Sequence, residues 1–156
     1  MDSEKTIISP HEAKAREYFL TGHTCAQSVI AAFCDVTGLP ESDALKLGSA
    51  LGGGLCGVRE GQPCGAVLGM LAVLGELKGM ETPAGEEKKA LYAMGRELQR
   101  KFTEEFGDID CAELLRDFTL SENPSERTPE YYAKRPCGKF IAGAARLLDE
   151  VTESDD

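Results

Sequence analysis

The chain has 156 residues and carries 27 Asp and Glu against 17 Lys and Arg, which gives a formal net charge of −10. Such an acidic balance argues against nucleic acid as a ligand, because a phosphate backbone is bound through Lys and Arg. The length suffices for one domain with its own hydrophobic core, and we expect a single domain over residues 1–156 with its core at about 10–150.

The cysteine content narrows the chemistry. No apolar stretch follows a basic start at the N-terminus, so we expect a cytoplasmic protein. Thiols stay reduced in that compartment, and six cysteines therefore point to metal binding or redox chemistry and away from structural disulfides.

The most apolar run, between Cys64 and Glu76, is shorter than the roughly 20 residues of a membrane-spanning helix, so we expect no membrane insertion. A homo-oligomer is compatible with the sequence.

Alanine, leucine, glutamate and lysine are abundant, and runs of β-branched residues are missing. We therefore predict an all-α fold, a single-domain bundle of about six or seven helices. Capping residues and hydrophobic spacing place the expected helices in this order: Pro10 to about Leu20, Cys25 to about Thr37, from 39–43 to Leu51, Cys64 to Leu77, Glu86 to about Phe106, a short helix within 108–115, one or two turns at 128–132, and Cys137 to Val151.

The segment 48–77 is the centre of this arrangement. Seven glycines fall within 48–65, and packing cannot explain the run 52–54, since glycine has no side chain to bury. These glycines permit a positive φ or a close approach of the main chain to a bound group. The helix that follows is apolar nearly all round, which predicts a buried central helix. Gly65 and Gly69 would let a neighbouring helix pack closely against it.

Four cysteines are predicted in the first turn of a helix: Cys25, Cys64, Cys111 and Cys137. Unpaired N–H groups and the helix dipole at that end favour thiolate, the form that binds metals and attacks disulfides. One buried cysteine alone is more often a small apolar side chain. Four of them in the same kind of place predict a shared redox-active or metal-binding site. Local motifs such as C-x-x-C are missing, so spacing alone does not choose the chemistry.

Other residues are weaker candidates for the same site. Cys56 lies in the glycine-rich loop and is a candidate fifth thiol, while Gly53, Gly54 and Gly65 are candidates for a close main-chain approach to a cofactor. We interpret Cys34 as a core residue. The loop lacks the Lys-Ser/Thr pair of a phosphate-binding loop, which argues against a nucleotide site.

The two histidines and the charged tip of the glycine-rich loop are interpreted as solvated. His11 and His23 are candidates for a mixed Cys/His site, but a lone histidine near a helix end is more often exposed to water. Arg59 and Glu60 are expected to form a solvated loop tip. No arrangement of His, Asp or Ser suggests hydrolysis, so we expect a redox or electron-transfer module more than a substrate-converting enzyme.

These residues resemble a known family. The C_GCAxxG_C_C family of small redox-active proteins is named for four cysteines and a Cys-Gly-Ala-x-x-Gly element. The matching segments are Thr24-Cys25-Ala26-Gln27-Ser28, Gly52-Gly53-Gly54, Cys64-Gly65-Ala66-Val67-Leu68-Gly69, Asp110-Cys111 and Pro136-Cys137. The resemblance implies a helical domain, and a related domain fused to a multihaem cytochrome has cysteines that look like ligands of an iron–sulfur cluster.

By that resemblance, Cys25, Cys64, Cys111 and Cys137 would hold an iron–sulfur cluster of the [2Fe–2S] type and exchange electrons with another redox protein. Two alternatives stay open. A pair of the same cysteines could cycle between dithiol and disulfide. The four could instead form a structural Cys₄ zinc site in an adaptor protein.

Overall fold

The structure is a computed structural model and describes residues 9–83 and 85–153. In these ranges the chain forms helices, loops and one isolated β-bridge between Pro63 and Asp110, which confirms the all-α prediction. The helices are α1 (Pro10–Leu20), α2 (Cys25–Ala32), α3 (Cys34–Thr37), α4 (Glu41–Gly48), α5 (Gly52–Leu55), α6 (Gly65–Lys78), α7 (Gly85–Phe106), α8 (Cys111–Leu114), α9 (Pro129–Lys134) and α10 (Cys137–Glu153).

The helices outnumber the six or seven predicted because several are single turns. The predicted helix from Cys25 to Thr37 is interrupted at Phe33, which is completely buried and separates α2 from α3. The predicted third helix ends at Gly48, and α5 forms a separate turn in which Gly53 and Gly54 adopt left-handed backbone angles. A single turn is too short to show helical periodicity in a sequence.

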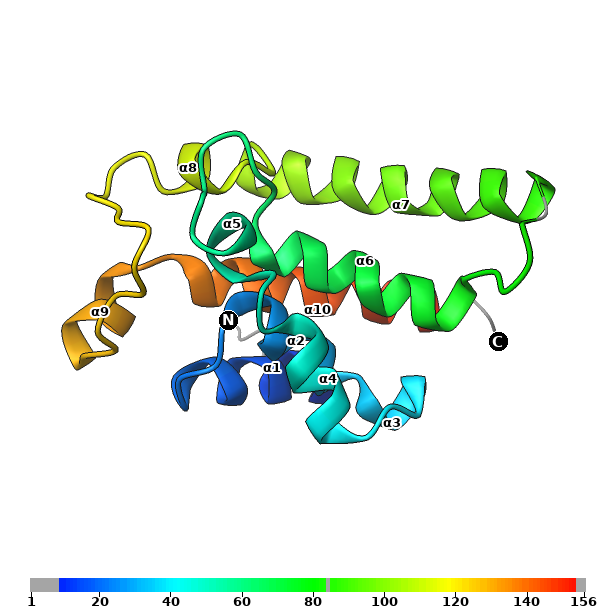
Figure 1. Cartoon of the computed structure of the whole chain (residues 1–156), viewed down its shortest axis with the longest axis horizontal. Coiled ribbons are helices and arrows are strands. Elements are labelled where there is room, and N and C mark those ends of the chain that lie inside the picture. The colour runs from blue at the N-terminus through cyan, green and yellow to red at the C-terminus, as the bar shows by residue number, and fades with distance from the viewer. Residues whose placement is uncertain (1–8, 84, 154–156) are drawn as a thin grey trace, which may run out of the picture.

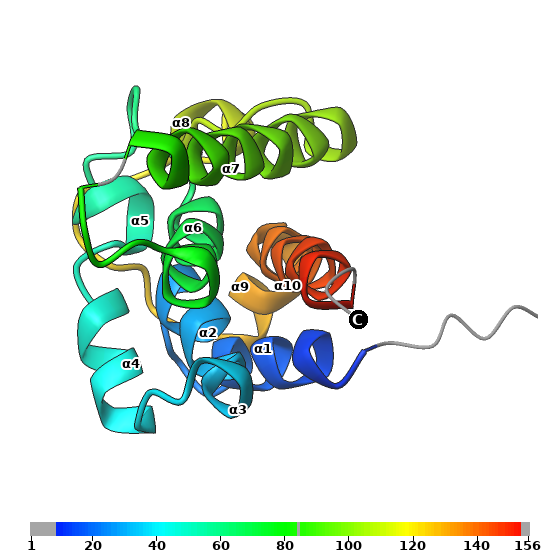
Figure 2. The same cartoon turned by 90° about the vertical axis from the view of Figure 1, so that its right-hand side faces the viewer.

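The bundle has three layers. Figure 2 shows α7 and α8 on one side, α6 and α10 in the middle, and α1 to α4 on the other side. In Figure 1, α6 and α10 run in the same direction and α7 runs in the opposite one. The N-terminal ends of α6 and α10 therefore lie at the same end of the bundle as α5 and α8. No helix in the described ranges has both the length and the apolar character needed to cross a membrane.

The contact between α2 and α6 is unusually close because glycines face it. A Cβ on Gly69 would lie 2.9 Å from the carbonyl oxygen of Ala26 and 3.1 Å from the Cβ of Val29. A Cβ on Gly65 would lie 3.1 Å from the Cβ of Cys25. The structure thus confirms that these two glycines admit a neighbouring helix, and it identifies that helix as α2.

The predicted central helix, α6, lies in the middle layer but is not buried on every side. Val67, Met70 and Val73 are completely or almost completely buried, whereas Ala72 and Glu76 are exposed. The helix α10 buries more of its length, including Ile141 and Leu148. The core therefore lies between α6, α10 and the layer of α1 and α2.

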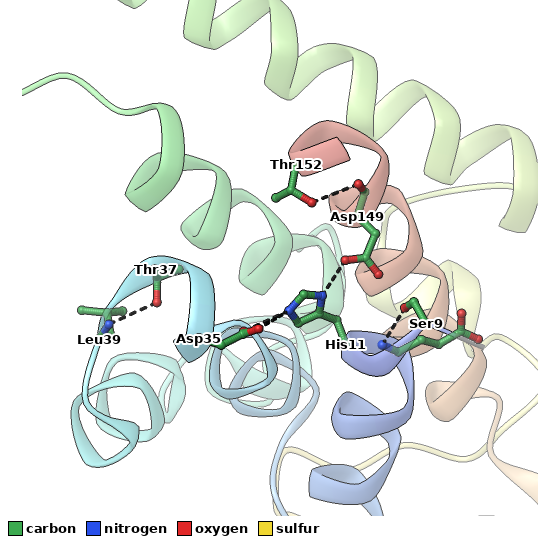
Figure 3. Close-up of polar contacts among 8 residues, drawn as sticks. Ser9, His11, Asp35, Thr37, Leu39, Asp149 and Thr152 are labelled. Carbon is green, nitrogen blue, oxygen red and sulfur yellow. Dashed lines mark hydrogen bonds and ion pairs between the residues drawn. The ribbon is translucent and has the colours of Figure 1, made fainter. Parts of the chain in front are cut away.

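His11 connects three helices at the other end of α10 (Figure 3). Its Nδ1 lies 2.6 Å from Asp149 Oδ1, its Nε2 lies 2.9 Å from both carboxylate oxygens of Asp35, and its ring stacks on Phe33 at 4.2 Å. Both nitrogens can donate at once only in the imidazolium form. The interpretation of His11 as a solvated residue is wrong, because two carboxylates from distant segments bind it. The second oxygen of Asp149, Oδ2, is buried without a hydrogen-bond partner in the described structure.

Two glycines of α6 make a matched test of the close helix contact. We expect Gly69→Ala to lower the free energy of unfolding by about 1–3 kcal/mol, because its methyl group would meet the backbone of α2. Gly75→Ala meets nothing within 4 Å and should be neutral or stabilising by up to about 1 kcal/mol. Urea unfolding of both variants measures this, and equal effects would contradict the packing argument.

The ion-pair cluster gives a second stability test. His11→Ala leaves the carboxylate of Asp149 buried without its imidazole partner, and we expect a loss of about 3 kcal/mol in the free energy of unfolding. Asp35→Asn is the control, because the Asp35 side chain is 57% exposed and its ion pair should contribute about 1 kcal/mol or less. If the two variants lose the same stability in urea unfolding, Asp149 does not depend on His11.

Candidate functional site

The structure brings the four predicted cysteines to one cavity of about 250 Å³ at the end of the bundle where α6 and α10 begin. The cysteines in its lining are Cys25, Cys56, Cys64, Cys111 and Cys137. Cys34 is not in this lining; it lies on α3, partly buried against the core. Among the described cysteines, the cavity thus separates the predicted set and Cys56 from Cys34.

Helix starts position three of these thiols as predicted. Cys25 is the first residue of α2 behind Thr24, which forms a complete capping box with Gln27. Cys111 is the first residue of α8 behind Asp110, whose side chain accepts a hydrogen bond from the Glu113 N–H at 3.1 Å. Cys137 is likewise the first residue of α10. These capping side chains orient the first turns that carry the thiols.

Cys64 differs from the prediction by one position. It is the N-cap residue of α6 and precedes the first helical turn, so Pro63 lies outside the helix. The cause is the β-bridge, in which the Cys64 N–H donates to the Ile109 carbonyl at 2.6 Å and the Cys111 N–H donates to the Gln62 carbonyl at 2.7 Å. Two backbone bonds therefore fix Cys64 beside Cys111, although the two residues are far apart in the sequence.

Cys25 and Cys137 contact each other directly. A side-chain hydrogen bond joins their sulfurs, and this bond is the largest influence on both groups. It raises the pKa of Cys25, which keeps its proton and donates it, and it lowers the pKa of Cys137 to about 7. The guanidinium of Arg135 further favours the Cys137 thiolate.

Burial dominates at the other two predicted sites. It raises the pKa of Cys64 to about 12, even though the backbone N–H groups of Ala66 and Val67 bond its sulfur and act in the opposite direction. Burial also raises the pKa of Cys111 against the attraction of Arg59. The expectation that helix starts would favour thiolate at all four positions is therefore wrong for three of them. Desolvation penalises the charged form more strongly at Cys64 and Cys111, and at Cys25 the hydrogen bond with Cys137 has the larger effect.

Three arginines from separate segments also line the cavity: Arg59, Arg127 and Arg135. Arg59 Nη1 lies 3.9 Å from Cys111 Sγ, within the range of a long N–H to sulfur contact. The interpretation of Arg59 as part of a solvated tip is thus wrong, although Glu60 is exposed as expected. Sequence reasoning missed Arg135 as well, and its position two residues before Cys137 was the available signal.

Arg127 and Arg135 enclose an aromatic side of the cavity. Their guanidinium carbons lie 5.1 Å and 4.9 Å from the ring centre of Tyr131, and Arg127 also donates to the carbonyls of Phe19 and His23. Burial raises the pKa of Tyr131 to about 12, so its hydroxyl stays neutral at ordinary pH. His23, a candidate for a mixed Cys/His site, is not in the cavity lining, and its Nδ1 lies 3.0 Å from the Tyr18 carbonyl.

The glycine-rich loop forms one wall. Gly53 and Gly65 are in the lining, and Gly54 lies behind Cys111 with no room for a Cβ. Cys56 is exposed, has a left-handed φ of 57°, and its Sγ donates to the Ala50 carbonyl at 3.2 Å. That these residues approach a cofactor stays a prediction.

In the described residues, no three or more His, Cys, Asp and Glu side chains are arranged to hold one metal ion. The thiols thus surround a space and do not converge on a point.

The comparison with protein families decides the assignment. The family model described as "Putative redox-active protein (C_GCAxxG_C_C)" matches residues 23–151. The chain belongs to this family. The Cys-Gly-Ala-x-x-Gly element of the C_GCAxxG_C_C name corresponds to 64–69, where α6 begins at the cavity. The assignment supports redox activity as the general function of the chain. No curated protein and no solved structure matches it.

The ionisation of Cys137 gives a test by pH. In reduced, metal-free protein we expect one thiolate to form as the pH rises through about 7, while Cys64 keeps its proton until about pH 12. Because the folded-state pKa lies below the ordinary value of 9.0, the Cys137 thiolate stabilises the fold above that pH, and this contribution is lost as the pH falls through about 7.

Thiolate absorbance in the ultraviolet measures this titration. The step near pH 7 should disappear in Cys137→Ser and persist in Cys34→Ser, whose thiol lies outside the cavity. A step that survives in Cys137→Ser would assign the thiolate to another cysteine.

Proposed function

We propose that the protein is a redox module in which Cys25, Cys64, Cys111 and Cys137 hold an iron–sulfur cluster of the [2Fe–2S] type. The observation that carries the proposal is the cavity of about 250 Å³ that these four thiols line together with three arginines. Four cysteines are the usual ligand set of such a cluster. Bound there, the cluster would accept and release one electron, and the partner would be another electron-transfer protein.

The distribution of the thiols favours a cluster over a single ion. Zinc in a structural site needs its four ligands around one point, at about 2.3 Å for each sulfur. No group of three donors in the described chain has such an arrangement. A cluster with two irons shares the four thiolates in pairs, and Cys25 and Cys137 already form one contacting pair. The zinc adaptor therefore has no observation in its favour.

The charges around the cavity favour an anionic centre. Four thiolates on two ferric ions and two sulfides leave a net negative charge, which is costly to bury without compensation. The chain has a net charge of −10, yet Arg59, Arg127 and Arg135 line this cavity, and among the described residues of the lining Glu122 is the one acidic side chain. The N–H groups of Ala66 and Val67 add donors at the Cys64 sulfur. These residues would stabilise the negative charge and, with it, the reduced form.

A second candidate function is a dithiol/disulfide couple formed by Cys25 and Cys137. The specific observation is their sulfur–sulfur hydrogen bond, with one thiol lowered in pKa to about 7 beside Arg135. Such a thiolate is a competent attacking group at neutral pH. The Cys137 thiolate would attack the partner's disulfide, which breaks that S–S bond, forms a mixed disulfide and releases one partner sulfur as thiolate. Cys25 would then lose its proton and attack the Cys137 sulfur, which closes the Cys25–Cys137 disulfide and releases the second partner sulfur, so the partner becomes a dithiol.

Metal analysis of protein purified without oxygen tests the first candidate. We expect iron and acid-labile sulfide at about two each per chain, with visible absorption. Cys64→Ser should lose both, because its thiol is buried in the cavity, and Cys34→Ser should keep both.

Equal iron loss in the two variants would contradict the ligand assignment. Colourless protein without iron, with a reversible disulfide mapped to Cys25 and Cys137, would favour the second candidate. One zinc per chain would instead favour the adaptor.

A further inference from the structure

The end of α5 and the loop that follows it carry backbone strain. Three residues other than glycine have left-handed φ angles there: Leu55 at 61°, Cys56 at 57° and Arg59 at 66°. Residues other than glycine rarely adopt such φ angles. The angles persist only where the surrounding structure enforces them. The surrounding structure therefore holds this loop in an unfavourable conformation.

The loop holds the backbone of Arg59. The Arg59 N–H donates to the Gly54 carbonyl at 3.0 Å, and the Arg59 carbonyl accepts from the N–H groups of Gln62 at 3.1 Å and Ala112 at 3.4 Å. Its side chain is fixed as well, since Nε donates to the Ser121 carbonyl at 3.1 Å. Three segments of the chain thus converge on this one arginine.

Gly54 makes the approach of Arg59 to the thiol site possible. A Cβ on Gly54 would lie 2.8 Å from the Arg59 Cα and 2.8 Å from the Cys111 Cβ. Any larger residue would push these two residues apart, and Arg59 Nη1 now lies 3.9 Å from Cys111 Sγ. This contact accounts for the glycine at position 54.

The other two arginines of the cavity have additional or different partners. Arg127 donates to the carbonyls of Phe19 and His23 and so joins the segment before α9 to the end of α1. The guanidinium of Arg135 acts on Cys137, where it favours the thiolate. Arg59 is therefore the guanidinium that faces Cys111.

We propose that Arg59 is a positioning residue of the redox centre: it holds the sulfur of Cys111 and offsets the negative charge of the reduced form, which raises the reduction potential. The proposal rests on the proposed redox function. Reduction adds an electron from the partner protein to the centre and breaks no bond to Arg59. The same sign holds for the Cys25–Cys137 couple, because the Arg59 charge also favours the Cys137 thiolate over the neutral disulfide.

The midpoint potential is the readout, since a merely structural loop residue would not move it. In Arg59→Gln we expect the reduced form to be at least about tenfold less stable relative to the oxidised form, which lowers the potential by about 59 mV for a one-electron centre. Arg59→Lys keeps the charge, and its potential should lie closer to that of the wild type. Arg116→Gln is the control, because it removes the same charge from a 74% exposed side chain that lies outside the cavity lining.

An unchanged potential in folded Arg59→Gln would overturn the proposal. If Arg59→Gln does not fold, Arg59→Met is judged by the same criterion, since its side chain retains most of the aliphatic stem. The redox function fails separately: in that case the wild-type protein itself shows neither a cluster nor a reversible thiol couple. A wild-type couple with an unmoved Arg59→Gln potential refutes only the role of Arg59.

Discussion

The close contact of α2 and α6 is the constraint on which the site depends. Backbone meets backbone along this interface because Gly65 and Gly69 have no Cβ to keep the helices apart. The same contact places the first turn of α2, with Cys25, next to the start of α6, with Cys64. In the Cys-Gly-Ala-x-x-Gly element, the glycines therefore set the distance between α2 and α6. This short distance brings the cysteine of the element close to Cys25.

The site end of the molecule is built differently from the rest. Away from the cavity, long helices bury large apolar side chains such as Phe102 and Ile141, and His11 joins three helices through ion pairs. At the cavity, α5 and α8 are single turns. The Asp110 side chain caps α8, the β-bridge between Pro63 and Asp110 joins its start to the start of α6, and arginine contacts with Tyr131 lie at α9. Directional bonds can fix several thiols around an open space, whereas apolar packing would fill it.

Electrostatics in the cavity balance burial against charge. Burial keeps Cys64 and Cys111 protonated in the absence of a cation, and Cys25 gives its proton to a hydrogen bond. Only Cys137, of the four, favours the thiolate form. A bound cation would displace the protons from all of them, since metals bind thiolate. The arginines of the lining would then offset the negative charge that remains on the thiolates and the bound group. This would explain why an acidic chain has a basic lining in this cavity.

The sequence by itself determined what local rules control. Thr24 and Asp110 are capping residues that predict helix starts, so the cysteines after them could be assigned to first turns. Gly65 and Gly69 predicted a close contact with a neighbouring helix. Only the tertiary structure decided which charged groups meet the thiols. Arg59 reaches Cys111 across 52 positions of sequence, and His11 reaches Asp149 across 138. Such contacts depend on how distant segments pack, and so does the order of the thiol pKa values, because burial is a property of the assembled bundle and no local pattern encodes it.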